Sequence, residues 1–202
     1  DDVFKLIRSG ENTHVRVALV DHNNLGPSLS HLDERVDVVI DHHLDERKYT
    51  TASPRIIVAS GSCASLVTAT VNEAFTNFDD MSQDAAKLLL GAIVADTICM
   101  DKSKGRYKPE DDVAIELLRL LSPKTDHKLL FQDLLDAKNN ITGLSASEVL
   151  RRDYKQRISG NFTFGIASIS CSLEELAAKP ALESSIQDCI TGNNLACLGI
   201  MS

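Results

Sequence analysis

Short runs of apolar, mostly β-branched residues near the start of the chain predict parallel strands. The run at 38–40 follows a polar segment and is typical of a buried strand, a second run covers 14–20, and a third covers 56–59. The first two end in an acid followed by histidine, at Asp41 and Asp21. Because ligands bind beyond the carboxyl ends of strands in open α/β sheets, these endings are candidates for the protein's chemistry.

Helical periodicity alternates with these strands up to about residue 121. Helices are predicted over residues 2–9, from Ser62 to about Phe75, from Asp84 to about Thr97 and from Pro109 to Leu121. The third of these helices carries apolar residues on every side, so we expect it to be fully buried. It ends near Asp96, where the helix dipole disfavours an anion, and we therefore expect a cation beside this carboxylate.

The pattern changes after residue 121. Residues 122–126 contain a proline and are the expected linker. Beyond it we expect a helix over 127–138, a helix opened by a capping box at 145–148, a strand over 162–170, a helix opened at Ser172 and a strand-like end over 195–201. The predicted fold class is α/β: a parallel-sheet domain over 1–121, followed by a smaller α+β domain over 127–202.

Composition and charge narrow the classes of function. The net charge of −8 over 202 residues argues against broad binding to nucleic acid, and no apolar run approaches the roughly 18 residues of a membrane span. Five widely spaced cysteines, none in a Cys-x-x-Cys pair, indicate reduced thiols and a cytoplasmic location. The chain opens Asp1-Asp2 without a methionine, so we expect its natural N-terminus to lie further upstream.

Polar residues after the two strands and at the end of the apolar helix share the chemistry of metal ligands: Asp21, His42, His43 and Asp96. Carboxylate and imidazole groups suit Mn²⁺, with Mg²⁺ a weaker fit because of the imidazoles. One carboxylate can bridge two ions roughly 3.5–4 Å apart. The alternative is that each residue is an ordinary polar group at a strand end, but two Asp-His endings favour the metal. The amides near Ser62 could hold an anion or simply cap a helix.

Motifs in a characteristic order resemble those of the DHH phosphoesterases. They are Val20-Asp21-His22-Asn23, Ile40-Asp41-His42-His43 and Ala95-Asp96-Thr97. Residues 61–68 resemble the helix start of the exopolyphosphatase and prune branch, which is similar to the family II inorganic pyrophosphatases. Residues 150–155 resemble the Asp-x-Lys motif of that branch's second domain, DHHA2. The resemblance covers almost the whole chain and implies a parallel-sheet DHH domain followed by a DHHA2-like domain.

The resemblance implies roles for the residues of the first domain. Asp21 would bridge two metal ions, His42 would ligate one of them, and Asp96 would complete the metal set. The implied catalytic residues are His43, which would contact substrate phosphate as a donor or acid, and Asp41, which would orient an imidazole through its N–H.

The resemblance also implies substrate contacts and a function. Lys155 would close onto phosphate from the second domain, and Ser62 is a further candidate for binding substrate, beside His43. The implied function is hydrolysis of a phosphoanhydride bond in pyrophosphate or short polyphosphate by a water activated between two Mn²⁺ or Mg²⁺ ions. No nucleic-acid or membrane partner is expected.

Two other functions stay open. A DHH nuclease or cyclic-nucleotide phosphodiesterase would carry a different second domain with a glycine-rich motif, and no two glycines are adjacent here. A non-catalytic, prune-like interaction protein would use the same fold to bind protein partners. Nothing in residues 1–13 matches the first metal motif of the family, and its late basic motif would lie beyond Ser202. We therefore expect a chain truncated at both ends, which binds at most one ion and is impaired by itself.

Overall fold

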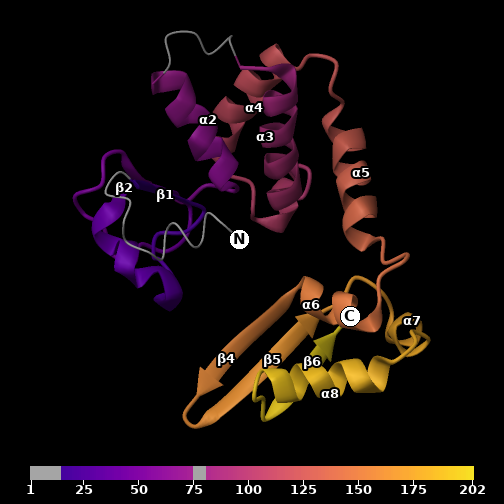
Figure 1. Cartoon of the computed structure of the whole chain (residues 1–202). Helices are drawn as coiled ribbons and strands as arrows, with labels where there is room; N and C mark the ends of the chain where they lie inside the picture. The colour runs from indigo at the N-terminus through magenta and orange to yellow at the C-terminus, as the bar shows by residue number, and fades with distance from the viewer. Residues whose placement is uncertain (1–14, 75–80) are drawn as a thin grey trace. The chain divides into compact units, whose positions relative to one another are not determined.

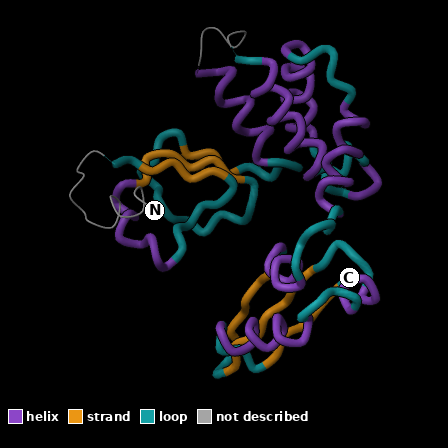
Figure 2. The backbone as a smooth tube through the Cα atoms, turned by 45° about the vertical axis from the view of Figure 1, so that its right-hand side comes forward, coloured by secondary structure: helices purple, strands orange, loops and turns teal. Residues whose placement is uncertain are grey.

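The protein forms two compact units, described here from a computed structural model that covers residues 15–74 and 81–202 (Figure 1). The predicted helix over residues 2–9 and the predicted helix end near Phe75 lie outside the described residues. Contacts divide the chain between Leu134 and Leu135. Each unit contains one three-stranded sheet, as Figure 2 shows in orange.

The first unit is built on a parallel sheet, as the sequence predicted. Its strands are β1 (Val17–Val20), β2 (Val36–Asp41) and β3 (Arg55–Ile57), in the order β1-β2-β3. A 3-10 helix, η1 (Pro27–Arg35), connects β1 to β2. Val39 is fully buried in β2, and Leu19 of β1 packs in the same cluster. The parallel register aligns Val20 with Ile40, which brings the residues that follow each strand to one edge of the sheet.

Three helices complete the first unit: α2 (Cys63–Ala74), α3 (Gln83–Asp96) and α4 (Pro109–Leu121), with a short 3-10 turn, η3 (Lys102–Lys104), between the last two. Helix α2 packs on β2 through Cys63, Leu66 and Ile40. Ser82 caps α3 by accepting a hydrogen bond from the backbone N–H of Ala85 at 3.1 Å. The serine cap of α3 and the proline that opens α4 explain why these two helices begin where the sequence predicted.

The expectation that α3 is buried on all sides is wrong. Ala86, Leu90, Ile93 and Val94 are fully buried against α4, but Leu88 is 76% exposed. The neighbouring helices cover the face of α3 whose residues are spaced three and four apart. The opposite face, which includes Leu88, stays at the surface. None of the helices in the described part of the chain has both the length and the apolar composition needed to cross a membrane.

The second unit is the smaller α+β domain that the sequence predicted. It contains α6 (Ala146–Arg152), β4 (Tyr154–Ser159), β5 (Phe162–Ser168), α7 (Leu173–Ala177), α8 (Leu182–Gly192) and β6 (Cys197–Met201). Strand β5 pairs antiparallel with β4 and parallel with β6. Its core joins Val149 and Leu150 of α6 to Ala167 of β5 and Leu176 of α7. The fold class is therefore confirmed for both parts of the chain.

Helix α5 (His127–Asn139) spans the division between the units. Leu130 and Phe131, in its first half, pack against the core of α3 and α4. This packing explains why contacts divide the chain later than the linker expected at 122–126, which lies between α4 and α5. The assignment of 122–126 as the linker stays a prediction.

Candidate metal centre

The ends of β1 and β2 bring one carboxylate and two imidazoles together. Asp21 directly follows β1 in the left-handed backbone region, with φ of 66°, and its N–H donates to the carbonyl of Ile40 at 3.0 Å. His42 and His43 directly follow β2. The Oδ1 atom of Asp21 lies 3.1 Å from Nε2 of His42 and 3.9 Å from Nδ1 of His43. Parallel pairing of the two strands thus assembles the predicted cluster.

In the described part of the chain, Asp21, His42 and His43 form the group whose ligand atoms all lie within 4.8 Å of one another. Asp96 was predicted to complete this set, but it is not among these three residues. It ends α3 as predicted, and its Oδ2 accepts a hydrogen bond from the hydroxyl of Ser62 at 2.6 Å. The structure therefore brings Asp21 and His42 together with His43, the predicted phosphate contact, and a metal contact of Asp96 stays a prediction.

The ring of His42 is oriented by a backbone carbonyl. Its Nδ1 lies 3.0 Å from the carbonyl oxygen of Ser60, which can only accept, so Nδ1 carries the proton and Nε2 keeps its lone pair. That lone pair faces a carboxylate oxygen of Asp21 at 3.1 Å. In the neutral ring these two electron-pair donors face each other, an arrangement that a proton or a cation between them stabilises, and a divalent ion fits this donor set.

Asp41 is fully buried and holds the second imidazole. Its Oδ1 accepts hydrogen bonds from Nδ1 of His43 at 2.8 Å and from the backbone N–H of His42, and its Oδ2 accepts from the amide of Asn23. Burial disfavours the charged carboxylate, but these hydrogen bonds outweigh burial and lower the pKa of Asp41. The geometry supports the predicted orienting role of Asp41.

Asn23 is a residue of the site whose role sequence reasoning missed. It is 4% exposed, and besides Asp41 it contacts the next loop, where its amide donates to the carbonyl of Leu44 at 3.1 Å and its oxygen accepts from the N–H of Glu46 at 2.9 Å. The Asp-His-Asn order was visible in the sequence, but only the fold shows that the asparagine joins the two strand ends.

The imidazole of His43 is expected to titrate above the ordinary histidine value of about 6.5. The hydrogen bond to Asp41 raises its pKa, against the opposing effect of partial burial. Protonated His43 therefore stabilises the folded chain below the free-histidine pKa, and this contribution is lost as the pH rises through the higher folded pKa. An NMR titration of the chelator-treated chain measures the pKa of His43, and Asp41→Asn should lower the midpoint of this titration. An equal midpoint in both proteins would contradict this assignment.

The predicted substrate contact of Ser62 has no support in its surroundings. Ser62 is fully buried, and its hydroxyl is donated to Asp96. The N–H groups of Gly61 and Ser62, which were expected to hold an anion or cap the helix, donate instead to the side chain of Asp111. An internal carboxylate thus takes the place in which the sequence allowed a phosphate.

The second unit contains Lys155, the predicted phosphate-binding lysine, on β4. Its ammonium group lies 3.2 Å from Oδ1 of Asp153, and its side chain is 59% exposed. An exposed pair of this kind contributes little to stability, so the lysine is available for other contacts. Its role in binding phosphate stays a prediction.

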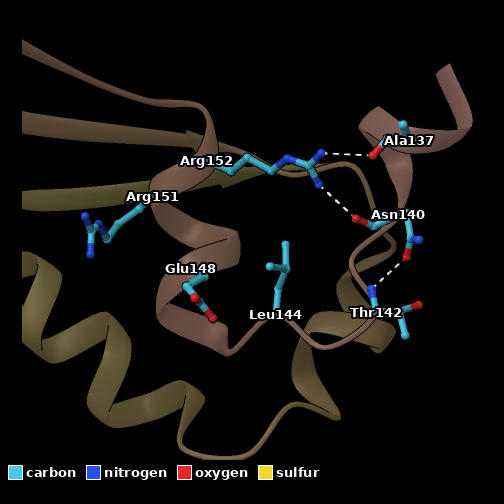
Figure 3. Close-up of a pocket in the computed structure, with 7 residues that line it drawn as sticks. All are labelled: Ala137, Asn140, Thr142, Leu144, Glu148, Arg151 and Arg152. Carbon is cyan, nitrogen blue, oxygen red and sulfur yellow. Dashed lines mark hydrogen bonds between the residues drawn. The ribbon is translucent and has the colours of Figure 1, made fainter. Parts of the chain in front are cut away.

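A cavity of about 710 Å³ in the second unit is lined by two arginines, of which Arg152 has a structural role (Figure 3). The guanidinium group of Arg152 donates to the carbonyl oxygens of Ala137 at 3.1 Å and of Asn140 at 3.0 Å, at the end of α5. These bonds satisfy carbonyls that a helix end leaves unpaired. The arginine therefore ties α5 to α6, and Figure 3 shows its head group directed at these carbonyls.

The first unit is thus a parallel sheet whose edge carries a carboxylate–imidazole cluster that could hold a metal ion, and an α+β unit follows it in the chain. The model of the DHHA2 domain matches residues 132–202. The chain superimposes with a TM-score of 0.65 on a Methanococcus jannaschii protein assigned to the family II inorganic pyrophosphatases, at 19% identity and over 98% of this chain and 69% of that one. Residues 132–202 thus match the DHHA2 domain, and the chain shares the fold of that protein.

The chain is also similar to named relatives over most of its own length. It is 34% identical over 155 residues to the exopolyphosphatase PRUNE1 of Mus musculus, covering 76% of this chain and 33% of the relative. It is 28% identical over 196 residues to the "Probable manganese-dependent inorganic pyrophosphatase" of Bacillus pumilus, covering 95% and 61%. The chain spans about a third of the length of the PRUNE1 relatives. It is a homologue of these proteins, which confirms the resemblance drawn from its motifs.

Proposed function

We propose that this chain provides the metal centre and the DHHA2 domain of a manganese-dependent phosphoanhydride hydrolase. The observation that carries the proposal is the 3.1 Å distance between Oδ1 of Asp21 and Nε2 of His42, which places a carboxylate oxygen and an imidazole nitrogen where one ion can contact both. The names of the relatives, exopolyphosphatase and manganese-dependent pyrophosphatase, support the same reaction and metal. Asp21 and His42 would hold the ion together with Asp96, with Mn²⁺ as the preferred ion and Mg²⁺ as the weaker alternative, and His43 would stay free to contact phosphate.

The residues of the chain divide the work of the reaction. A bound divalent ion supplies a water of lowered pKa, near 7, and neutralises phosphate oxygens. Asp41 accepts a hydrogen bond from Nδ1–H of His43. When the ring is protonated, its Nε2–H is free to donate to a phosphate oxygen or a leaving group. In the chain without an ion, the hydrogen bond to Asp41 raises the pKa of His43, so the donor form persists to higher pH than in a free histidine.

We propose inorganic pyrophosphate or short polyphosphate as the substrate. Both carry dense negative charge, which a divalent ion, His43 and the exposed ammonium group of Lys155 can neutralise. The five cysteines are all free, which supports a reducing compartment such as the cytoplasm. A DHH nuclease or phosphodiesterase is the alternative enzyme, and a prune-like interaction protein is the alternative without catalysis.

We expect the complete product of the gene encoding this chain to release phosphate from pyrophosphate and tripolyphosphate with Mn²⁺, and to leave cyclic AMP and a phosphodiester intact. Phosphate release is measured with Mn²⁺ and with Mg²⁺. His42→Ala should remove the activity, whereas His31→Ala, an exposed histidine, should keep it. Hydrolysis of the diesters alone would favour the nuclease class, and no hydrolysis of any substrate would favour the interaction protein.

A further inference from the structure

The turn that precedes α2 surrounds a single buried carboxylate, which Asp111 provides from the first turn of α4. Its Oδ2 accepts hydrogen bonds from the backbone N–H of Gly61 at 3.0 Å and of Lys108 at 2.8 Å. Its Oδ1 accepts from the N–H of Ser62 at 3.3 Å and from the hydroxyl of Ser65 at 2.6 Å. Asp111 is 0% exposed, and these four donors compensate a charge that is removed from water.

The same turn contacts the candidate ligands on its other side. The carbonyl of Ser60 accepts from Nδ1 of His42 at 3.0 Å. The hydroxyl of Ser62 donates to Asp96 at 2.6 Å. These two serines flank the glycine whose amide donates to the buried carboxylate. The position of that carboxylate therefore fixes the polar atoms that orient the imidazole and the acid.

Capping of α4 does not account for this arrangement. As a cap of α4, Asp111 needs only its hydrogen bond from the backbone N–H of Lys108. The other three donors come from 61–65, 46 to 50 residues away in the sequence. A buried charge is costly when any of its donors is missing, so the turn has little freedom to move while the carboxylate is in place.

We propose that Asp111 is a positioning residue of the metal centre. By holding the 60–62 turn, it fixes the Nδ1–H form of His42 and directs Nε2 toward Asp21. The proposal rests on the proposed function for the identity of the ion, but the form of the imidazole can be measured without any metal. Residues that orient a ligand in this way commonly change metal affinity by about 10–100-fold.

The test compares Asp111→Asn with Glu110→Gln. Both remove one negative charge from the first turn of α4, but Glu110 is exposed. We expect Asp111→Asn to give mixed imidazole forms of His42 in ¹⁵N NMR spectra of the chelator-treated chain, and to weaken Mn²⁺ binding in calorimetry by about 10–100-fold. Glu110→Gln should leave the spectrum and the affinity as they are in the original chain.

A pure Nδ1–H signal of His42 in Asp111→Asn, with unchanged Mn²⁺ affinity, would overturn the proposal. If Asp111→Asn does not fold, Ser65→Ala removes one of the four donors and should shift the His42 signal in the same direction, and an unshifted signal there would also overturn it. Failure of the original chain to bind Mn²⁺ would instead count against the proposed function, and the NMR comparison would still decide the role of Asp111.

Discussion

Replacing His42 with alanine is expected to abolish measurable binding of Mn²⁺ by the chain. His42 supplies one of three donor atoms that lie within 4.8 Å of one another, and its ring is already held by the carbonyl of Ser60. Loss of a residue that only orients a ligand costs about 10–100-fold in affinity, and loss of the ligand itself should cost more. The expected ligands, Asp21, His42 and Asp96, suit one ion, so we expect at most one weakly bound Mn²⁺ per chain before the substitution.

Isothermal titration calorimetry with Mn²⁺ measures this loss. His31→Ala is the matched control, because it removes an imidazole from an exposed position. Asp21→Asn should resemble His42→Ala, whereas Asp41→Asn should weaken binding less, because Asp41 contacts the imidazole of His43 rather than the space between the donors. Unchanged affinity in His42→Ala, or tight binding of two ions by the original chain, would contradict this account of the site.

Replacing Gly61 with alanine is expected to destabilise the first unit by about 2–6 kcal/mol. A Cβ atom at this position would lie 2.3 Å from Oδ2 of Asp111, 2.5 Å from the carbonyl oxygen of Arg106 and 2.8 Å from Cγ2 of Thr97. Overpacking of this kind costs about 1–3 kcal/mol or more, and displacing a buried carboxylate from its donors adds about 1–3 kcal/mol. The same displacement should weaken Mn²⁺ binding, because the turn also orients the metal ligands.

Urea denaturation followed by circular dichroism measures the change in the free energy of unfolding. Gly26→Ala is the control: a Cβ atom there meets nothing within 4 Å, and φ is −64°, which alanine adopts freely. We expect the control to stay within about 1 kcal/mol of the original chain. Equal midpoints for the two alanine variants would show that the contacts around Gly61 are looser than the structure indicates.

Features that depend on local sequence could be predicted. The strands β1 and β2 follow from runs of β-branched residues. Their Asp-His endings predicted that Asp21 and His42 lie at the carboxyl edge of the sheet. The helix starts at Ser145 and Ser172 follow from capping boxes, which the structure contains. These signals lie within a few residues of the feature that they determine, so a single sequence shows them.

Features that depend on packing could not be predicted. The role of Asp111 is such a feature, because its contacts with Gly61 and Ser62 join residues about fifty positions apart. Those contacts also bury Ser62, which made the expected phosphate contact unsupported. Leu88 was expected to be buried because its helix is apolar on every side. Which sides are covered depends on where the neighbouring helices pack, which the sequence does not show.

Diffraction from crystals grown with Mn²⁺, recorded at the manganese absorption edge, tests the central claim most directly. The account predicts one anomalous peak at coordination distance, about 2.0–2.6 Å, from Oδ1 of Asp21 and Nε2 of His42. Donor atoms in adjacent positions on one ion lie about 3 Å apart, so the present 3.1 Å between these two atoms needs little change. A manganese peak elsewhere on the chain, with none beside Asp21 and His42, would contradict it.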